Sequence, residues 1–419
     1  MRTYNEALAW MFEQLPYYQN KGKIGYRPGL DRVRNLADYL GNPQSKLKLI
    51  HIAGTNGKGS TAHLIASVLI ESGYKTGLFI SPHFLDYRER ITIGGKKIPK
   101  EFVLQFINSH FKVLSQWGLS FFEMNIGLAL EYFRYEKVDY AILEVGLGGR
   151  LDATNIVCPI LSVITNIGLD HTEYLGDTLE KIAYEKGGII KNKVPVLIGQ
   201  RQKGIDKVFE NISRTLDAPL YYSQPYPYMG ELTPNWPKYQ YKNIQTAHGA
   251  LDLLRQIEKI DLQIVKGINN TALNTSFMGR WQVISQQPLV VLDVAHNIEG
   301  FKEILTELES ITFEKLHLVM GFVKGREHKS IFRLLSEKGI LYLSTPKVER
   351  AKSKSELLND LPGDLNFHHQ YYPSIEEAFD GALSRAVEND MILVCGSTFV
   401  VAEIIDHLKR RKCRIDFQG

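Results

Sequence analysis

The chain has 419 residues, of which 44% are hydrophobic and 23% are charged. This is the composition of a soluble globular protein, and at roughly 150 residues per domain the length predicts two or three domains. The net charge of +4, from 50 basic and 46 acidic residues, is too balanced to indicate a nucleic-acid-binding protein.

Three widely spaced cysteines, Cys158, Cys395 and Cys413, cannot form a disulfide framework or a CxxC metal site, so we expect a reducing compartment. The N-terminus is charged and lacks the apolar core of a signal peptide. No apolar run approaches the roughly 20 residues of a membrane span. We therefore expect a cytoplasmic protein with no membrane partner, and a monomer, because no segment indicates a subunit interface.

Apolar segments of strand length alternate with longer amphipathic segments through the first half of the chain. This alternation is typical of a parallel sheet with helical crossovers, whose strands are buried on both faces. The predicted strands are 48–54, 76–81, 140–146, 161–167 and 194–199. The predicted helices are about 59–72, 100–116, 122–136 and 178–190.

A polar, aromatic and Pro-rich stretch over 221–242 predicts turns and strand-like pairs, and a helix follows over about 242–258. Asn, Thr and Gly enrichment over 268–279 suits an interdomain linker. A second α/β series comprises strands 289–295, 315–322, 339–345 and 391–397, with helices 298–310, 328–338, 353–360 and 374–389. We thus predict an α/β protein with a P-loop-type, mostly parallel sheet domain over 1–272 and a smaller Rossmann-like α/β domain over 273–419.

The segment HIAGTNGKGST (51–61) departs from the usual phosphate loop, G-x-x-x-x-G-K-[ST]. Ile52 replaces the first glycine, and Gly59 follows Lys58 where Ser or Thr is usual. The physical parts of such a loop are still present, because a strand ends at glycines, a lysine supplies charge, and a helix then begins. From the loop alone, a generic Gly-rich turn is the alternative.

The loop variant G-T-N-G-K-[GST]-[ST] is typical of the Mur ligase superfamily, and longer segments resemble its folylpolyglutamate and dihydrofolate synthases. They follow the family's order over most of the chain: ISPHFLDYRERITIGG (80–95), SFFEMNIGLAL (120–130), EVGLGGRLDATN (144–155), DHTEYLGDTLEKIAYEKGGIIK (170–191), MGRWQ (278–282) and DVAHN (293–297). One segment departs from it: where many members have D-K-D, this chain has Arg326, Glu327 and His328. That change puts the contacts of the second domain with its substrate in doubt.

The resemblance implies that ATP is a cosubstrate bound by the loop and by later residues. The implied contacts are Gly54, Thr55, Asn56, Gly57, Lys58, Gly59, Ser60, Asn243, Arg280 and Asp293. Asn243 matches an adenine-contacting Asn in a Q-x-x-N motif. The resemblance places Asp293 on the ribose hydroxyls and Arg280 on the phosphates or the adenine.

Glu144 ends a buried strand beside three glycines, at the crevice where parallel sheets bind ligands. We predict that it binds Mg²⁺, which prefers hard oxygen ligands; a capping or salt-bridging Glu is the alternative. The resemblance adds Ser81, His171 and Lys186 as ligands of two Mg²⁺ ions. It implies that CO₂ converts Lys186 to a carbamate, whereas its place near a helix C-terminus also suits a surface lysine. The resemblance implies that the catalytic residues are Lys58, Lys186, Glu144 and His171.

Two further groups of residues are expected to bind the substrates. For the folate or dihydropteroate acceptor they are Phe121, Phe122, Glu123, Arg150 and Asp152. Aromatic rings suit a flat heterocycle, although core packing accounts equally well for one of the two phenylalanines. For L-glutamate we expect His296 and Ser397, the latter also suited to a helix N-cap.

The resemblance therefore implies ATP-dependent ligation of L-glutamate to a folate or dihydropteroate carboxylate through an acyl phosphate. In the bifunctional members of the family, an aspartate in the segment that matches RLDATN is linked to dihydropteroate. The presence of Asp152 here therefore favours activity on both acceptors. The nearest alternative is a Mur-type ligase for a different carboxylate, such as a cell-wall nucleotide precursor. It is disfavoured because no UDP-binding domain precedes the loop. A P-loop switch or motor and a non-enzymatic nucleotide-binding module are more distant alternatives.

Overall fold

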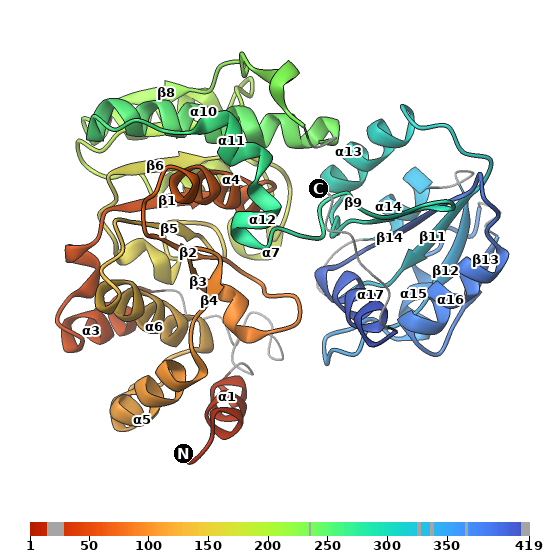
Figure 1. The fold of residues 1–419 in the computed structure, drawn as a ribbon, viewed down its shortest axis with the longest axis horizontal. Helices are drawn as coiled ribbons and strands as arrows, with labels where there is room; N and C mark the ends of the chain where they lie inside the picture. The colour runs from red at the N-terminus through yellow and green to blue at the C-terminus, as the bar shows by residue number, and fades with distance from the viewer. Residues whose placement is uncertain (15–28, 234–235, 325–327, 336–338, 365–367, 412–419) are drawn as a thin grey trace. The chain divides into compact units, whose positions relative to one another are not determined.

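The computed structural model describes residues 1–14, 29–233, 236–324, 328–335, 339–364 and 368–411. The chain divides into two compact units, Met1–Thr233 with Gln240–Phe277 and Pro234–Tyr239 with Met278–Gly419. The boundary predicted after residue 272 falls inside helix α12 (Thr271–Thr275) of the first unit (Figure 1). No helix among these residues is long and apolar enough to cross a membrane.

The sheet of the first unit has the strand order β4-β3-β2-β5-β1-β6-β7-β8. All neighbours from β2 to β8 pair in parallel, and β3 and β4 extend one edge in antiparallel fashion. This mostly parallel sheet confirms the predicted fold class. The strands are β1 Leu49–Ala53, β2 Thr76–Phe79, β3 Ile91–Ile93, β4 Lys96–Lys97, β5 Tyr140–Glu144, β6 Leu161–Ile164, β7 Val196–Ile198 and β8 Leu220–Tyr222.

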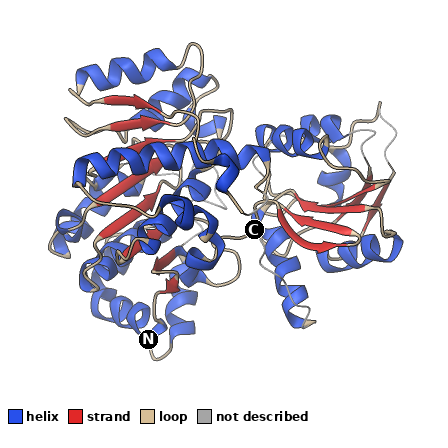
Figure 2. Ribbon diagram, turned by 45° about the horizontal axis from the view of Figure 1, so that its top comes forward, coloured by secondary structure: helices blue, strands red, loops and turns tan. Residues whose placement is uncertain are grey.

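Helices cover both faces of this sheet, as Figure 2 shows. Helix α4 packs on β1, β2 and β5, while α6 shares a buried apolar cluster with Leu49, Phe79 and Leu143. The helices are α1 Tyr4–Glu13, α3 Asp31–Tyr39, α4 Lys58–Glu71, α5 Lys100–Gln116, α6 Phe121–Tyr135, α7 Thr172–Leu175, α8 Leu179–Gly187, α9 Asp206–Thr215, α10 Lys238–Glu258, α11 Ile264–Asn269 and α12. Short 3₁₀ helices are η2 Pro43–Lys46, η3 Tyr87–Arg90, η4 Ala153–Ile156 and η5 Met229–Glu231.

Two sequence-based expectations for the connecting segments are wrong. The residues expected to link the domains, 268–279, largely belong to α11 and α12, which pack on α4. Asn270 and Asn274 both donate to Glu71 Oε2, at 3.0 and 2.9 Å, so their polar side chains hold helices together. In 221–242 the described residues form the end of β8, then η5 and the start of α10, and no two of its described segments pair as strands.

The second unit has one sheet with the order β13-β12-β11-β14-β10-β9, parallel except for β9. Helices flank it on both faces (Figure 2), which confirms a second α/β unit. Its strands are β9 Gln282–Gln286, β10 Leu289–Leu292, β11 Leu316–Met320, β12 Ile340–Leu343, β13 His369–Tyr371 and β14 Met391–Cys395. Its helices are α13 Ile298–Leu308, α14 Lys329–Leu335, α15 Lys354–Asn359, α16 Ile375–Arg385 and α17 Thr398–Arg410.

Candidate active site

The phosphate-loop segment joins β1, at the centre of the first sheet, to the N-terminus of α4. Gly57 caps α4 with φ 82°, and a Cβ there would lie 2.1 Å from Asn243 Oδ1. Gly54 has φ 152°, and a Cβ there would lie 1.8 Å from Thr165 Oγ1. Glycine is needed at both positions for backbone conformation and for close approach. The segment therefore has the strand–glycine turn–helix geometry that a phosphate loop requires, and its contact with phosphate stays a prediction.

The segment after β6 fixes the shape of this loop. Thr55 N–H donates to the backbone oxygen of Asn166 (2.9 Å), and Asn56 N–H donates to Asn166 Oδ1 (2.9 Å). Thr165 Oγ1 donates to the backbone oxygen of Asn56 (2.6 Å). The sequence analysis did not select Thr165 and Asn166, although polar residues directly after a buried strand were a usable signal.

Helix α10 brings a second polar pair to the loop. Gln240 Nε2 donates to Ser60 Oγ at 3.2 Å, and Asn243 Nδ2 donates to Gln240 Oε1 at 2.8 Å. Gln240 is fully buried. Asn243 therefore lies against the loop, as an adenine-contacting residue requires, but its contact with a nucleotide stays a prediction.

Two lysines converge on one backbone oxygen of the loop. Lys58 Nζ donates to the oxygens of Gly54 (3.0 Å) and Thr55 (3.1 Å). Lys186 Nζ, from the last turn of α8, donates to the oxygen of Gly54 at 2.8 Å. Lys186 is only 4% exposed, so the alternative of a surface lysine is wrong. Burial, and then the charge of Lys58, lower the pKa of Lys186 from 10.5 to about 7.

Glu144, at the end of β5, is buried at the same edge of the sheet. Its Oε2 accepts from Ser81 N–H at 3.0 Å, and both of its oxygens lie 3.6 Å from the position of a Cβ on Gly59. Ser81 and Glu144 are thus adjacent, next to the start of α4. His171 caps α7 with φ 52°, directly after Asp170.

The residues present fit a magnesium site of the usual kind. Among the described residues, no group of three or more His, Cys, Asp and Glu side chains could hold a metal by itself. Magnesium commonly takes one or two carboxylates and completes its shell with phosphates and water. The Glu144 carboxylate and the Ser81 hydroxyl supply hard oxygens beside a phosphate loop, whereas a nitrogen ligand such as His171 is less usual for this ion.

The aromatic residues expected to bind the acceptor pack against other side chains of the protein. The ring of Phe121 stacks on Phe12, with centroids 5.2 Å apart and planes at 18°. Phe122 contacts Phe79 at 5.8 Å between centroids. Glu123 forms a capping box with Ser120 and an ion pair with Arg32 at 3.0 Å. These contacts give Phe121, Phe122 and Glu123 structural roles, and their contact with substrate stays a prediction.

Asp152 and Arg150 follow the Gly-rich segment after β5. Asp152 is buried, and it accepts from Leu147 N–H (2.8 Å), Thr154 N–H (3.0 Å) and Thr154 Oγ1 (2.5 Å). His51 Nε2 lies 2.8 Å from Thr154 Oγ1, so a polar chain joins β1 to the glycine loop. Arg150 is exposed and pairs with Glu185 at 2.8 Å. Neither residue is placed against a substrate by these contacts.

In the second unit, Asp293 is buried at the C-terminal end of β10. Its oxygens accept from Tyr239 Oη (2.5 Å), Trp281 N–H (2.8 Å) and Ala295 N–H (2.8 Å). Burial raises the pKa of Asp293, and the charge of Arg280 opposes that rise. The sequence analysis missed Tyr239, which no local motif marks.

His296 and Ser397 lie at the C-terminal edge of the second sheet. Ser397 caps α17 by accepting from Val400 N–H (3.2 Å), as its alternative role predicted, and His296 Nδ1 lies 2.8 Å from the oxygen of Val294. Their contact with glutamate stays a prediction. Of the three residues that replace D-K-D, Arg326 and Glu327 lie outside the described residues. The third, His328, is buried against Phe322.

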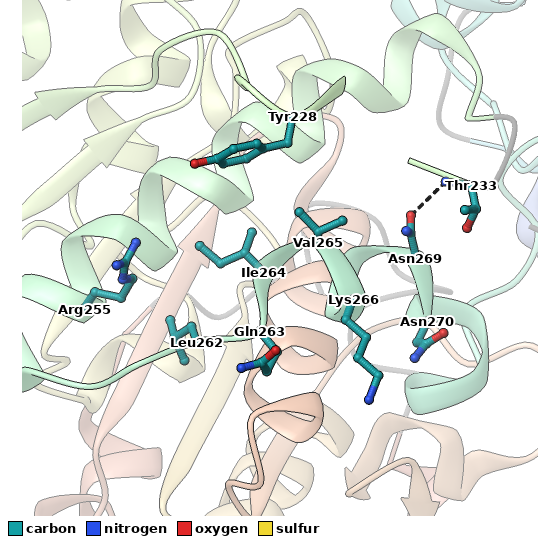
Figure 3. A pocket seen from close by; sticks show the side chains of 10 residues that line it. All are labelled: Tyr228, Thr233, Arg255, Leu262, Gln263, Ile264, Val265, Lys266, Asn269 and Asn270. Carbon is teal, nitrogen blue, oxygen red and sulfur yellow. Dashed lines mark hydrogen bonds between the residues drawn. The ribbon is translucent and has the colours of Figure 1, made fainter. Parts of the chain in front are cut away.

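A further pocket lies elsewhere in the first unit. It encloses about 650 Å³ and is lined by residues of α10, α11 and the segments beside them (Figure 3). Lys266, one of the lining residues, pairs with Glu71 at the C-terminal end of α4. The phosphate loop lies at the other end of this helix, whose 14 residues span about 20 Å. This pocket is therefore separate from the loop and from Glu144.

Comparison with known proteins places both units in one family. Residues 52–215 match the Mur ligase middle domain, and residues 279–398 match the glutamate ligase domain of Mur ligases. A Bacillus subtilis dihydrofolate synthase/folylpolyglutamate synthase is 30% identical, covering 97% of this chain and 99% of its own. A probable bifunctional folylpolyglutamate synthase/dihydropteroate synthase of Haloferax volcanii is 33% identical over 96% of this chain, which spans about half (50%) of that longer relative.

Two solved structures match this chain over nearly its whole length. An E. coli FolC in complex with DHPP and ADP has a TM-score of 0.85 at 27% identity, covering 97% of this chain and 98% of its own. A bifunctional folylpolyglutamate synthase/dihydrofolate synthase with Mn, AMPPNP and L-glutamate bound has a TM-score of 0.83 at 29% identity, covering 98% of each chain. The chain belongs to the Mur ligase family, among the dihydrofolate synthases/folylpolyglutamate synthases.

Proposed function

We propose that this protein uses ATP to ligate L-glutamate to the carboxylate of dihydropteroate or of a reduced folate, with the reaction taking place in the cytoplasm. The observation that carries the proposal is the convergence of Lys58 and Lys186 on Gly54, beside Glu144 and the N-terminus of α4. Such a cluster suits a triphosphate, because it joins positive charge to backbone N–H groups and a metal-binding carboxylate. Both acceptors are included because the relatives bear both activities in their names.

In the first step, a carboxylate oxygen of the acceptor attacks the γ-phosphorus of ATP. The bond to the β,γ-bridging oxygen breaks, so that ADP leaves and an acyl phosphate remains. In the second step, the neutral α-amine of glutamate attacks the acyl carbon, the bond from carbon to the phosphate oxygen breaks, and the nitrogen loses a proton. The products are the amide, ADP and inorganic phosphate.

The chain's own contribution is positioning and charge. Lys58 would leave the oxygens of Gly54 and Thr55 to contact the transferring phosphoryl group, and the backbone N–H groups at the N-terminus of α4 would hold the other phosphates. Glu144, Ser81 and His171 would hold Mg²⁺, which neutralises phosphate charge. In the second unit, Arg280 and Asp293 would contact the nucleotide, with His296 and Ser397 on glutamate.

Lys186 is proposed to carry a carbamate when the enzyme is active. Its burial and the neighbouring Lys58 favour the neutral amine, and only a neutral amine adds CO₂. Addition forms an N–C bond and releases a proton, which gives an oxygen ligand for a second Mg²⁺ ion. A carbamate would also place an anion beside the charged Lys58.

The proposed reaction is tested by supplying ATP, Mg²⁺, glutamate and either dihydropteroate or tetrahydrofolate. The acceptor carboxylate carries ¹⁸O, and the products are read by mass spectrometry. We expect one ¹⁸O atom in each inorganic phosphate released, together with an acceptor that is one glutamate heavier. Glutamate addition without ¹⁸O in phosphate would exclude the acyl phosphate, and no addition to either acceptor would exclude the activity.

A further inference from the structure

Arg90 is a buried arginine to which no role has been given above. It ends η3 and is 9% exposed. Its backbone oxygen accepts from Ile80 N–H at 3.0 Å, which fixes it next to the segment that carries Ser81. Burial lowers the pKa of Arg90 to about 10, and the charge of Glu144 opposes that shift. The guanidinium is therefore charged at neutral pH, in a position that disfavours charge.

Within the described residues, the side-chain contacts of Arg90 are made by Nε and by one face of the guanidinium. Nε donates to His83 Nδ1 at 2.8 Å, and the guanidinium carbon lies 5.2 Å from the centroid of the Phe121 ring. In the part of the chain that the structure describes, neither Nη1 nor Nη2 has a hydrogen-bond acceptor, and no acid forms an ion pair with them. A buried guanidinium that forms no ion pair is costly, and an anion supplied from outside would relieve that cost.

His83 adds a further donor beside this guanidinium. An arginine Nε always donates, so Nδ1 of His83 must accept, and the proton of the neutral ring is on Nε2. No described residue accepts a hydrogen bond from that Nε2. Arg90 and His83 together therefore offer three donor nitrogens, Nη1, Nη2 and the imidazole Nε2, that have no acceptor among the described residues.

Arg88, two residues away on the same 3₁₀ helix, shows the ordinary alternative. Its Nε and Nη2 donate to the two oxygens of Asp86 at 3.1 and 2.7 Å, and its side chain is 23% exposed. Arg88 thus has its own carboxylate, in the forked geometry that a guanidinium prefers. Arg90 has the same chemistry without the acid.

We propose that Arg90, assisted by His83, binds the acceptor carboxylate that is to be phosphorylated. This inference rests on the proposed function, because it assumes a pterin acceptor whose acid group reaches the edge of the first sheet. A forked guanidinium matches a carboxylate with two parallel hydrogen bonds and fixes its orientation. With Phe121 against one face of the guanidinium and Glu144 acting on its charge, the carboxylate would be held near Ser81 and the phosphate loop.

The test compares dihydropteroate with its neutral carboxamide analogue, both bound in the presence of Mg²⁺ and ADP so that no turnover occurs. Affinities are measured by calorimetry for the wild type, R90Q, R90K and the matched control R88Q. A charge-assisted pair predicts that the wild type prefers the carboxylate by about 10- to 100-fold. We expect R90Q to lower that preference to about threefold or less, R90K to be intermediate, and R88Q to match the wild type.

Each result decides one question. A folded R90Q protein that keeps the wild-type preference would overturn the inference, and so would equal losses of affinity for the two ligands, which would indicate a structural role. Should R90Q fail to fold, R90K is judged on the same ratio. If the wild-type protein binds neither pterin and adds glutamate to neither acceptor, the proposed function itself is wrong, independently of Arg90.

Discussion

The two units use charge differently at the C-terminal edges of their sheets. In the first unit, the buried Lys186 has one hydrogen bond within the described residues, to a backbone oxygen, and no acid among them forms an ion pair with it. The charges of Asp170 and Asp152 only partly oppose the fall in its pKa. In the second unit, the buried Asp293 already accepts from Tyr239 and from two backbone N–H groups. The first edge therefore has charge available for an anionic ligand, whereas the second edge uses its charge to fix a loop.

The largest effect should come from Lys58→Ala. The lysine's loop contacts are with backbone oxygens, so its loss should leave the fold intact while the transferring phosphoryl group loses a positive charge. We expect glutamate incorporation to fall about a thousandfold or more, with little change in Tm. Lys181→Ala, which removes an exposed lysine paired with Asp177, is the matched control and should remain active. Near-normal incorporation by Lys58→Ala would show that the triphosphate binds elsewhere.

Lys186→Ala should be the next most severe change, because it removes the proposed carbamate. We expect glutamate incorporation to fall about a hundredfold. Added acetate or formate should restore part of it, since a small carboxylate can occupy the space of the carbamate. Wild-type activity should also decline in buffers stripped of CO₂ and recover on adding bicarbonate. Absence of rescue, together with a wild-type rate independent of CO₂, would assign Lys186 to a role as an amine.

Tyr239→Phe tests whether the hydrogen bonds of Asp293 stabilise the second unit. The substitution removes the hydroxyl that donates to Asp293 and leaves a buried carboxylate oxygen with one fewer donor. We expect unfolding of the second unit to become easier by about 1–3 kcal/mol, measured by urea denaturation. The corresponding change at the first edge, Lys58→Ala, should cost far less stability. Equal stability of Tyr239→Phe and the wild type would contradict the structural role given to Asp293.

A further prediction concerns pH and His51, and it bears on stability at low pH only. Burial lowers the pKa of His51 from 6.5 to about 3, so the folded protein binds fewer protons than the unfolded chain between these values. Stability should therefore be lost as pH falls from about 6.5 towards 3. His51→Gln should show a shallower decline in Tm over this range, while Thr154→Val, which removes the partner of the ring, should keep the histidine's pH dependence. Parallel declines for His51→Gln and the wild type would contradict the shift.

The central strands were predictable because they are apolar without alternation. Residues 48–54 become β1 and 140–146 become β5, each ending sooner where the chain turns into a loop. The short strands β3, β4, β9 and β13, at or next to the sheet edges, were missed, since short strands of mixed polarity have no such pattern. The linker prediction failed because Asn270 and Asn274, a residue type common in turns, here donate hydrogen bonds to Glu71 of α4.

In the candidate site, too, features carried by one short segment were predictable, whereas features that depend on contacts between distant segments were not. A strand, glycines and a lysine in one short segment predict a phosphate loop. The place of Glu144 at the end of a buried strand predicts that it lies at the same edge of the sheet. The burial of Lys186 could not be read from α8, because it depends on the approach of Gly54, 132 residues earlier. Tyr239 and Arg90 likewise acquire their roles through contacts between distant segments.

The most direct test of the account is a crystal structure of the protein with Mg²⁺ and a non-hydrolysable ATP analogue. The account predicts that Lys58 turns from the oxygens of Gly54 and Thr55 to the γ-phosphate, with a metal ion between that phosphate and Glu144. A γ-phosphate bound away from Lys58 and Glu144 would contradict it.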